Sequence, residues 1–267
     1  MPIKMTIPTA TIKLPSEGKL YPEDHPLTNG EIEFHHMTAR EEDILASRSI
    51  LKQGTLINKL IESCVITGGI DPLKMLSCDR DALLIAIRIS GFGANYVTTA
   101  TCPFCSSTQQ LTFDLGGLNV KNLEAEPIKP RTNLFKFQLP VSKYNVTFKL
   151  QDGTDELRIV EKLKKIEQHN KRLEESKNQT LLITNEKEIT TRLSVLIKEI
   201  EGETDENTIA EVVEAMLTLD SRALRDYMEA IEPRVVMKSL VNCKECGMEK
   251  EFNIPVTVDF FWPSPGI

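Results

Sequence analysis

The 267-residue chain lacks the hydrophobic segments that direct a protein into or across a membrane. No apolar run approaches the ~20 residues of a membrane-spanning helix. The N-terminal residues, Met1 to Met5, are not part of the long apolar stretch that a secretory signal requires. With 40% hydrophobic and 27% charged residues, the composition is that of an ordinary soluble chain. We therefore expect a protein that is made and kept in a cytosol.

The chain also lacks the residue patterns of an enzyme. Its histidines fall in no metal-ligand or catalytic-triad spacing; they are His25, His35, His36 and His169. Adjacent strand residues point to opposite faces, so His35 and His36 are not expected to share a metal. No serine-hydrolase, zinc-protease or phosphate-loop motif occurs, and Gly91-x-Gly93 lacks the third glycine and the following helix of a dinucleotide site. We therefore expect no catalytic activity.

Basic clusters are scarce as well. The formal net charge is −7, and the one Lys/Arg-rich run, Lys162 to Lys165, lies in a segment of mixed charge. A protein with this charge repels a phosphate backbone unless its basic residues gather on one face. Nucleic-acid binding is therefore not the first expectation.

Cysteines, in contrast, are arranged in a pattern. Four of the six form two Cys-x-x-Cys pairs, Cys102 with Cys105 and Cys243 with Cys246. In a reducing cytosol such pairs are more typical of metal ligands or redox groups than of disulfides. The other two, Cys64 and Cys78, lie in apolar surroundings, where a thiol behaves as a small hydrophobic side chain.

The two cysteine pairs lie 141 positions apart (243 − 102), and other segments repeat at the same offset. Met75–Asp79 matches Met216–Asp220, and Gln110–Phe113 matches Glu251–Ile254. A shared offset over a helix, a turn and the following strand favours an internal duplication over chance matches. We predict an α+β fold with two copies of one unit, each a strand, helices and a Cys-x-x-Cys β-hairpin, at residues 31–125 and 130–257.

An extended N-terminal arm, residues 1–30, is expected to precede the first copy, because its prolines and glycines exclude long helices. Thr38 is expected to begin a helix with a capping-type sequence, and Asp79 to cap a later one. The remaining predicted elements are a short strand at 11–14, a strand at 30–34, helices at 55–65 and 79–89, and strands at 96–101 and 109–115 around the first cysteine pair.

The second copy is predicted to carry an insertion. Its first strand, which includes Val146, matches Ile32 of the first copy at an offset of 114 (146 − 32), so about 27 residues (141 − 114) are added before the second cysteine pair. Two apolar stripes in charged surroundings, Leu157 to Ile166 and Ile189 to Ile200, predict a helical hairpin at about 155–203 that stands out from the body.

The chain ends in an aromatic and proline-rich tail, residues 258–267, which contains Phe260, Phe261 and Trp262. We expect these aromatic side chains to pack on the core of this chain rather than to serve as a free surface for another subunit.

The four paired cysteines have the composition of a structural zinc site. A Cys-x-x-Cys turn directs two thiolates to one ion, and two such turns complete a tetrahedral shell with no open position for water or substrate. We therefore predict zinc at Cys102, Cys105, Cys243 and Cys246. Three alternatives remain: a thioredoxin-like redox pair, which usually lies where a strand enters a helix, an iron–sulfur cluster, and pairs that have lost their metal or form disulfides.

Several short segments resemble the T4-type baseplate proteins of contractile-tailed phages. They are Pro15 to Pro22, Met37 to Leu45, Leu60 to Val65, and a cysteine hairpin followed by Phe260-Phe261-Trp262-Pro263. The resemblance implies a structural or assembly role in the central hub of a tail baseplate, without enzymatic activity and with other hub and tail proteins as partners. It does not extend to the insertion at about 155–203.

A zinc-ribbon adaptor that binds nucleic acid or a transcription or processing complex is the alternative function. The Cys-x-x-Cys hairpins alone would favour it. Charge argues against it, because the first hairpin turn, Cys102 to Gln110, carries no basic residue.

Overall fold

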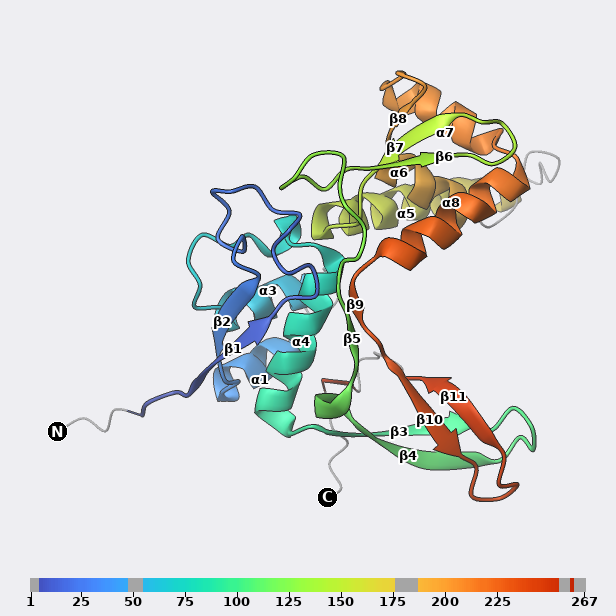
Figure 1. The fold of residues 1–267 in the computed structure, drawn as a ribbon. Helices are drawn as coiled ribbons and strands as arrows, with labels where there is room; N and C mark the ends of the chain where they lie inside the picture. The colour runs from blue at the N-terminus through green and yellow to red at the C-terminus, as the bar shows by residue number, and fades with distance from the viewer. Residues whose placement is uncertain (1–4, 48–54, 176–186, 255–259, 262–267) are drawn as a thin grey trace.

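The computed structural model describes residues 5–47, 55–175, 187–254 and 260–261. It has mixed α and β structure, with several small sheets and seven α-helices in these residues. Figure 1 shows three parts: an N-terminal body at the left, a second body at the top, and two β-ribbons at the lower right. Within the described residues, no helix combines the length and the apolar character needed to cross a bilayer.

The N-terminal body consists of a two-stranded sheet and three α-helices. Its elements are β1 (Thr9–Lys13), β2 (Glu31–His35), α1 (Ala39–Ala46), α3 (Leu56–Cys64), the 3₁₀ turn η1 (Pro72–Lys74) and α4 (Ser77–Phe92). β1 and β2 are antiparallel, with Ile12 opposite Ile32. The long helix α4 is buried on most sides, and the other elements of this body pack around it.

The N-terminal arm is not a free arm, which corrects the sequence-based expectation. Residues 9–13 form β1, and the turns that follow bury Leu14, Leu20, Tyr21 and Leu27 in the core. These four apolar side chains have no regular spacing, so no periodic pattern marks them. The segment folds back over α4 instead of reaching toward another subunit.

Two predicted helix starts have different outcomes. Thr38 caps α1 as expected, in a complete capping box with Glu41. Asp79 does not cap α4, because the helix begins two residues earlier, at Ser77. Its buried carboxylate accepts hydrogen bonds from the N–H and the hydroxyl of Ser16 and from the hydroxyl of Tyr21. Asp79 therefore anchors the N-terminal segment to α4.

The second body combines a three-stranded sheet with four helices. Its elements are β6 (Phe135–Gln138), β7 (Asn145–Phe148), α5 (Gly153–Glu175), α6 (Glu188–Leu196), β8 (Ile197–Ile200), α7 (Glu206–Glu214) and α8 (Thr218–Ile231). The sheet order is β6-β7-β8, and both pairs are antiparallel.

The predicted helical hairpin at about 155–203 is only partly correct. Two helices are present, but the second ends at Leu196, and Ile197 and Ile200 belong to strand β8. α6 packs against both α5 and α7, and Leu193 is buried in the core. This helix is therefore part of the second body and not one arm of a projecting hairpin. The predicted bend, at 174–181, lies mostly outside the described residues.

The β-ribbons leave the two bodies as separate antiparallel hairpins. They are β3 (Asn95–Thr101) with β4 (Thr108–Asp114), and β10 (Lys238–Asn242) with β11 (Glu249–Asn253). After the first ribbon the chain makes the 3₁₀ turn η2 (Leu115–Gly117) and the short strand β5 (Val120–Lys121). β5 pairs with β9 (Arg234–Val235), which leads from α8 to the second ribbon. The first ribbon lies at nearly the predicted positions. For the second, the sequence predicts strands at 235–241 and 251–256, and β10 and β11 begin within three residues of these.

Two further contacts join distant parts of the chain. Arg80 of α4 pairs with Glu156 of α5, which connects the two bodies. Phe260 and Phe261 are buried, and the carbonyl of Phe260 accepts a hydrogen bond from Arg88 of α4. For these two phenylalanines, packing on the chain's own core is as predicted, whereas Trp262 lies outside the described residues.

Candidate metal centre

The turns of the two ribbons have the same local conformation. In the first, the amide of Cys102 donates to the carbonyl of Ser107, and the amide of Ser106 donates back to the carbonyl of Cys102. In the second, Cys243 and Met248 form the first of these bonds, and Gly247 and Cys243 the other. Ser106 (φ 58°) and Gly247 (φ 68°) both have left-handed backbone conformations. Each turn therefore directs its two cysteine side chains to one side.

The two turns meet, and their four sulfur atoms form one cluster. All four Sγ atoms lie within 4.8 Å of one another. Across the two ribbons, Cys102 Sγ is 3.8 Å from Cys246 Sγ, and Cys105 Sγ is 3.7 Å from Cys243 Sγ. In a tetrahedral site with metal–sulfur bonds of about 2.3 Å, the sulfurs lie about 3.8 Å apart. The spacing therefore fits one four-coordinate metal ion.

The ionisation of the cluster also fits a cation. The amide N–H of Cys246 and the hydroxyl of Ser107 lower the pKa of Cys243 to about 6. The amide of Met248 acts in the same direction on Cys246, but burial and the other three cysteine sulfurs outweigh it and raise that pKa to about 12. Four sulfurs this close do not all ionise without a positive charge between them, and a divalent ion supplies that charge.

Two polar side chains next to the cysteines were not identified from the sequence. The hydroxyl of Ser107 lies 3.0 Å from Cys105 Sγ and 3.5 Å from Cys243 Sγ, so it contacts both ribbons. The side-chain oxygen of Gln109 accepts a hydrogen bond from the amide of Lys244, which also connects the ribbons. Their positions two and four residues after Cys105 are the only sequence signal for them.

The structure brings together all four predicted ligands and keeps the other cysteines apart. Cys64 and Cys78 are buried as free thiols in the core, and burial raises the pKa of Cys64 to about 12. Their burial is as expected of thiols that behave as small hydrophobic side chains. The four-cysteine cluster is the one group of three or more side chains in the described residues whose arrangement could hold a metal ion.

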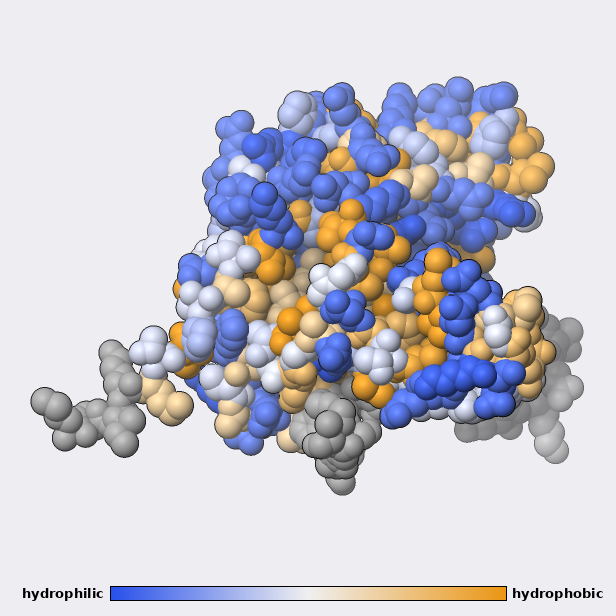
Figure 2. Space-filling view, turned by 60° about the horizontal axis from the view of Figure 1, so that its bottom comes forward, coloured by the Kyte–Doolittle hydropathy of each residue, from blue (hydrophilic) through white to orange (hydrophobic). Residues whose placement is uncertain are grey.

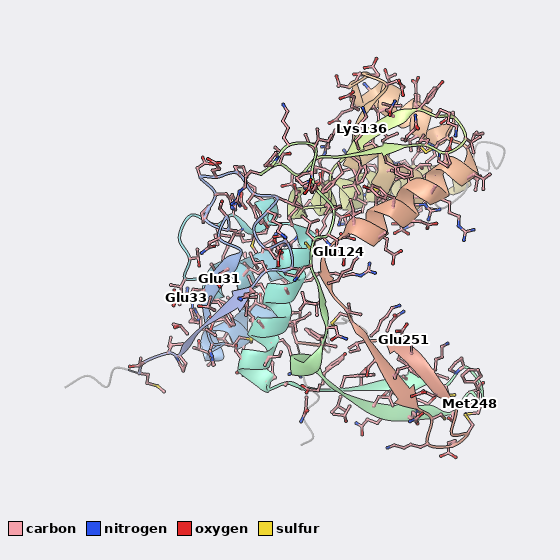
Figure 3. The ribbon with its side chains drawn as sticks, in the orientation of Figure 1. Glu31, Glu33, Glu124, Lys136, Met248 and Glu251 are labelled. Atoms are coloured by element: carbon pink, nitrogen blue, oxygen red, sulfur yellow. The ribbon has the colours of Figure 1, made fainter. Side chains whose placement is uncertain are left out.

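The charge of the ribbon surfaces does not favour binding of a polyanion such as nucleic acid. The first ribbon has no lysine or arginine between Asn95 and Asp114. In the second, from Lys238 to Asn253, three lysines are balanced by three glutamates. Figure 3 shows Glu251 on β11 and Met248 at the turn of that ribbon. Glu31 and Glu33 lie on β2 of the N-terminal body and Glu124 follows β5, so these acidic residues are outside the ribbons (Figure 3).

Comparison with known proteins gives one match. The family model of the T4 bacteriophage base plate protein matches residues 5–262, which is nearly the whole chain. No curated protein and no solved structure matches the chain. Since the family match covers both bodies and both ribbons, the chain belongs to the T4 bacteriophage base plate protein family.

Proposed function

We propose that this protein is a non-catalytic structural component or assembly factor of the hub of a phage tail baseplate, with a structural zinc ion bound by its four paired cysteines. Membership of the base plate family supports the role in a baseplate. The observation that supports a structural rather than a catalytic role for the metal is that four sulfurs surround one position and leave no place for a substrate. The protein is then made in the host cytoplasm and functions in the virion tail, among other hub and tail proteins.

The distances between the sulfurs support a single zinc ion over the alternatives. A disulfide requires sulfur atoms about 2.05 Å apart, and the contacts across the ribbons are 3.7 and 3.8 Å. An iron–sulfur cluster places several iron and sulfide ions between the cysteines and needs more room than one ion does. Both Cys-x-x-Cys turns lie between strands rather than at the start of a helix, which argues against a thioredoxin-like pair.

We further propose that the two bodies are copies of one unit and that the metal joins them. The offset of 141 relates the start of α4 at Ser77 to the start of α8 at Thr218, and the start of β4 at Thr108 to the start of β11 at Glu249. The left-handed Ser106 and Gly247 obey the same offset. Asp220 also resembles Asp79, since its carboxylate accepts two backbone N–H bonds from the loop that precedes β7.

The start of α5 in the second body resembles the start of α1 in the first body, 114 residues earlier, which also supports the duplication. Thr38 and Glu41 form the capping box of α1, and Asp152 and Asp155 exchange the same two bonds at the start of α5. Glu41 and Asp155 are both almost completely buried. A buried acid at this position in both bodies is an unusual feature for two unrelated helices to share.

The additional 27 residues then divide between two places. α3 begins at Leu56 and α6 at Glu188, an offset of 132, so 18 residues (132 − 114) are added in α5 and the loop after it. The other nine (141 − 132) lie between β8 and α8, where α7 replaces the short turn η1. Under this relation α6 corresponds to α3 and is not part of an insertion.

Protein mass spectrometry of purified phage tails and of tail-assembly intermediates tests the proposed role. We expect the chain in hub-containing particles or in the intermediates that precede them. Its absence from both would refute the role. Binding of DNA at physiological salt with a steep salt dependence would instead support the zinc-ribbon adaptor.

A further inference from the structure

A contact inside the chain joins the second body to the first. The turn that leads into α5 lies along the segment that begins α4, with an antiparallel bridge between Leu76 and Asp152. The amide of Ser77 donates to the carbonyl of Gln151, and the amide of Gly153 donates to the carbonyl of Met75. The hydroxyl of Ser77 also bonds to Glu156. As a result, Leu76 and Cys78 of the first body are only 3% and 6% exposed.

The equivalent segment of the second body is open. At the offset of 141, Leu76 and Cys78 correspond to Leu217 and Leu219, which are 52% and 67% exposed. Within the part of the chain that the structure describes, the amide of Thr218, the counterpart of Ser77, has no hydrogen-bond partner. Figure 2 shows hydrophobic residues at the right edge of the helical part, the side on which α8 begins in Figure 1. We define residues 216–221 as the acceptor face.

The element that would cover this face is also open, at the other end of the molecule. At the offset of 114, the turn at Gln151–Gly153 corresponds to Met37–Ala39, at the start of α1. Ala39, Arg40 and Glu42 are exposed, Met37 and Thr38 are half-buried, and Glu41 is buried. Figure 1 places α1 at the lower left and the start of α8 at the upper right, so one molecule cannot bring the two together. We define residues 37–42 as the donor turn.

From these two open surfaces we infer that the protein associates head to tail, with the donor turn of one copy on the acceptor face of the next. This inference rests on the proposed duplication. The contact would repeat the one between the two bodies, with the amide of Thr218 donating to the carbonyl of Met37 and the amide of Ala39 to that of Met216. Such a heterologous contact generates a ring or an open helical array rather than a closed two-fold dimer.

The side chains at the two open surfaces match. Thr218 faces Glu42 as Ser77 faces Glu156, so the hydroxyl–carboxylate bond is retained. Arg40 and Glu214 take the places of Thr154 and Leu73, which are joined by a hydrogen bond between the two bodies. Opposite charges would therefore meet at the rim, where Glu214 already pairs with Lys187. Burial of Leu217 and Leu219 supplies the apolar part of the contact.

Space is available for the side chain of Ala39, which stands where the equivalent turn has a glycine. The donor turn has Ala39 where α5 has Gly153, and a Cβ at Gly153 would lie 2.6 Å from Arg80 Nη1 and 3.0 Å from Leu73 Cα. The counterpart of Arg80 is Ser221, whose short side chain removes the first of these clashes. The second requires a shift of a few tenths of an ångström. The extra methyl group of Ala39 therefore fits against the acceptor face, and a long side chain at that position would not.

Sedimentation velocity of the full-length, zinc-loaded protein over a range of concentrations tests this contact. We expect multiples of the monomer mass in the wild type. Leu219→Glu should reduce association at least about 10-fold, because the contact would bury an unpaired charge. Leu240→Glu is the matched control, since Leu240 of β10 is also 67% exposed but lies on neither surface; it should associate as the wild type does.

A mixing experiment distinguishes a head-to-tail contact from other forms of association. Ala39→Arg blocks the donor turn and Leu219→Glu blocks the acceptor face, so each variant alone should be a monomer. An equimolar mixture should form a heterodimer and nothing larger, because each variant retains one working surface. A wild type that stays monomeric at ~100 μM, an L219E variant that associates normally, or a mixture without heterodimer would overturn the inference. Circular dichroism and zinc content, measured on the same samples, report separately on folding and on the proposed metal site.

Discussion

Asp79→Asn perturbs the buried network that holds the N-terminal segment on α4. The carboxylate of Asp79 accepts from the Ser16 N–H at 3.0 Å, from the Ser16 hydroxyl at 2.6 Å and from the Tyr21 hydroxyl at 2.8 Å. Tyr21 in turn accepts from the amide of Leu76 at 3.0 Å. Burial and the Asp79 charge raise the pKa of Tyr21, so its hydroxyl remains a donor.

The size of the effect follows from what asparagine can replace. Its carbonyl oxygen can still accept from the Ser16 N–H, but its NH₂ group faces the hydroxyls. Tyr21 cannot reverse its role because it already accepts from Leu76, so its proton loses an acceptor. A buried donor without a partner costs about 1–3 kcal/mol, and the weakened bond to the Ser16 hydroxyl adds to that. We expect Asp79→Asn to lower the free energy of unfolding by about 2–3 kcal/mol.

Urea unfolding of the zinc-saturated protein measures this loss. The set is the wild type, Asp79→Asn, Tyr21→Phe and the double variant. Because both single changes remove the same bond, the double variant should lose less than the sum of the two by about 1 kcal/mol. A loss below about 0.5 kcal/mol for Asp79→Asn, or strictly additive effects, would refute this role of the network.

Three other predictions concern acid stability, the metal and the tail. Burial raises the pKa of Glu41, but hydrogen bonds from Ser63 and Thr38 outweigh burial and lower that pKa below 4.5. The stability that the Glu41 carboxylate provides is complete above pH 4.5 and is lost as the pH falls further. Glu41→Gln should therefore make the free energy of unfolding, measured with urea, depend less on pH in the acid range. Ser107→Ala should weaken zinc affinity about 10-fold in a chelator competition, and an unchanged affinity would exclude the hydroxyl from the site. Phe260→Ala should cost about 3–5 kcal/mol of unfolding free energy, since its ring is fully buried; a cost below 1 kcal/mol would mean that the tail packs loosely.

The sequence was most informative where one local pattern determines the structure. The strand–Cys-x-x-Cys–strand segments, the capping box at Thr38 and the strand at Asn145 were predicted within a few residues, because short-range hydrogen bonds and alternation fix them. The four cysteines were also predicted as one group, and they do form a cluster. Their ligation of zinc stays a prediction.

The errors arose where tertiary contacts decide the structure. Leu193, Leu196, Ile197 and Ile200 have the spacing of one helix face, yet pairing with β7 converts the last two into a strand. The N-terminal segment has too few apolar residues for a core of its own, but its apolar side chains join the core cluster formed by the rest of the chain. Asp79 has the type and position of a capping residue. Its partners, more than 50 positions away in sequence, gave no local signal.

Metal analysis of purified protein tests most directly whether one ion joins the two ribbons. Inductively coupled plasma mass spectrometry should find one zinc per wild-type chain. Cys105→Ser with Cys246→Ser, which removes one ligand from each ribbon, should abolish stoichiometric zinc and make the protein prone to aggregate. Replacing both cysteines of either ribbon alone should abolish zinc equally, because neither pair fills the shell by itself. A wild type without metal, or any of these variants that retains one zinc per chain, would contradict a site shared by Cys102, Cys105, Cys243 and Cys246.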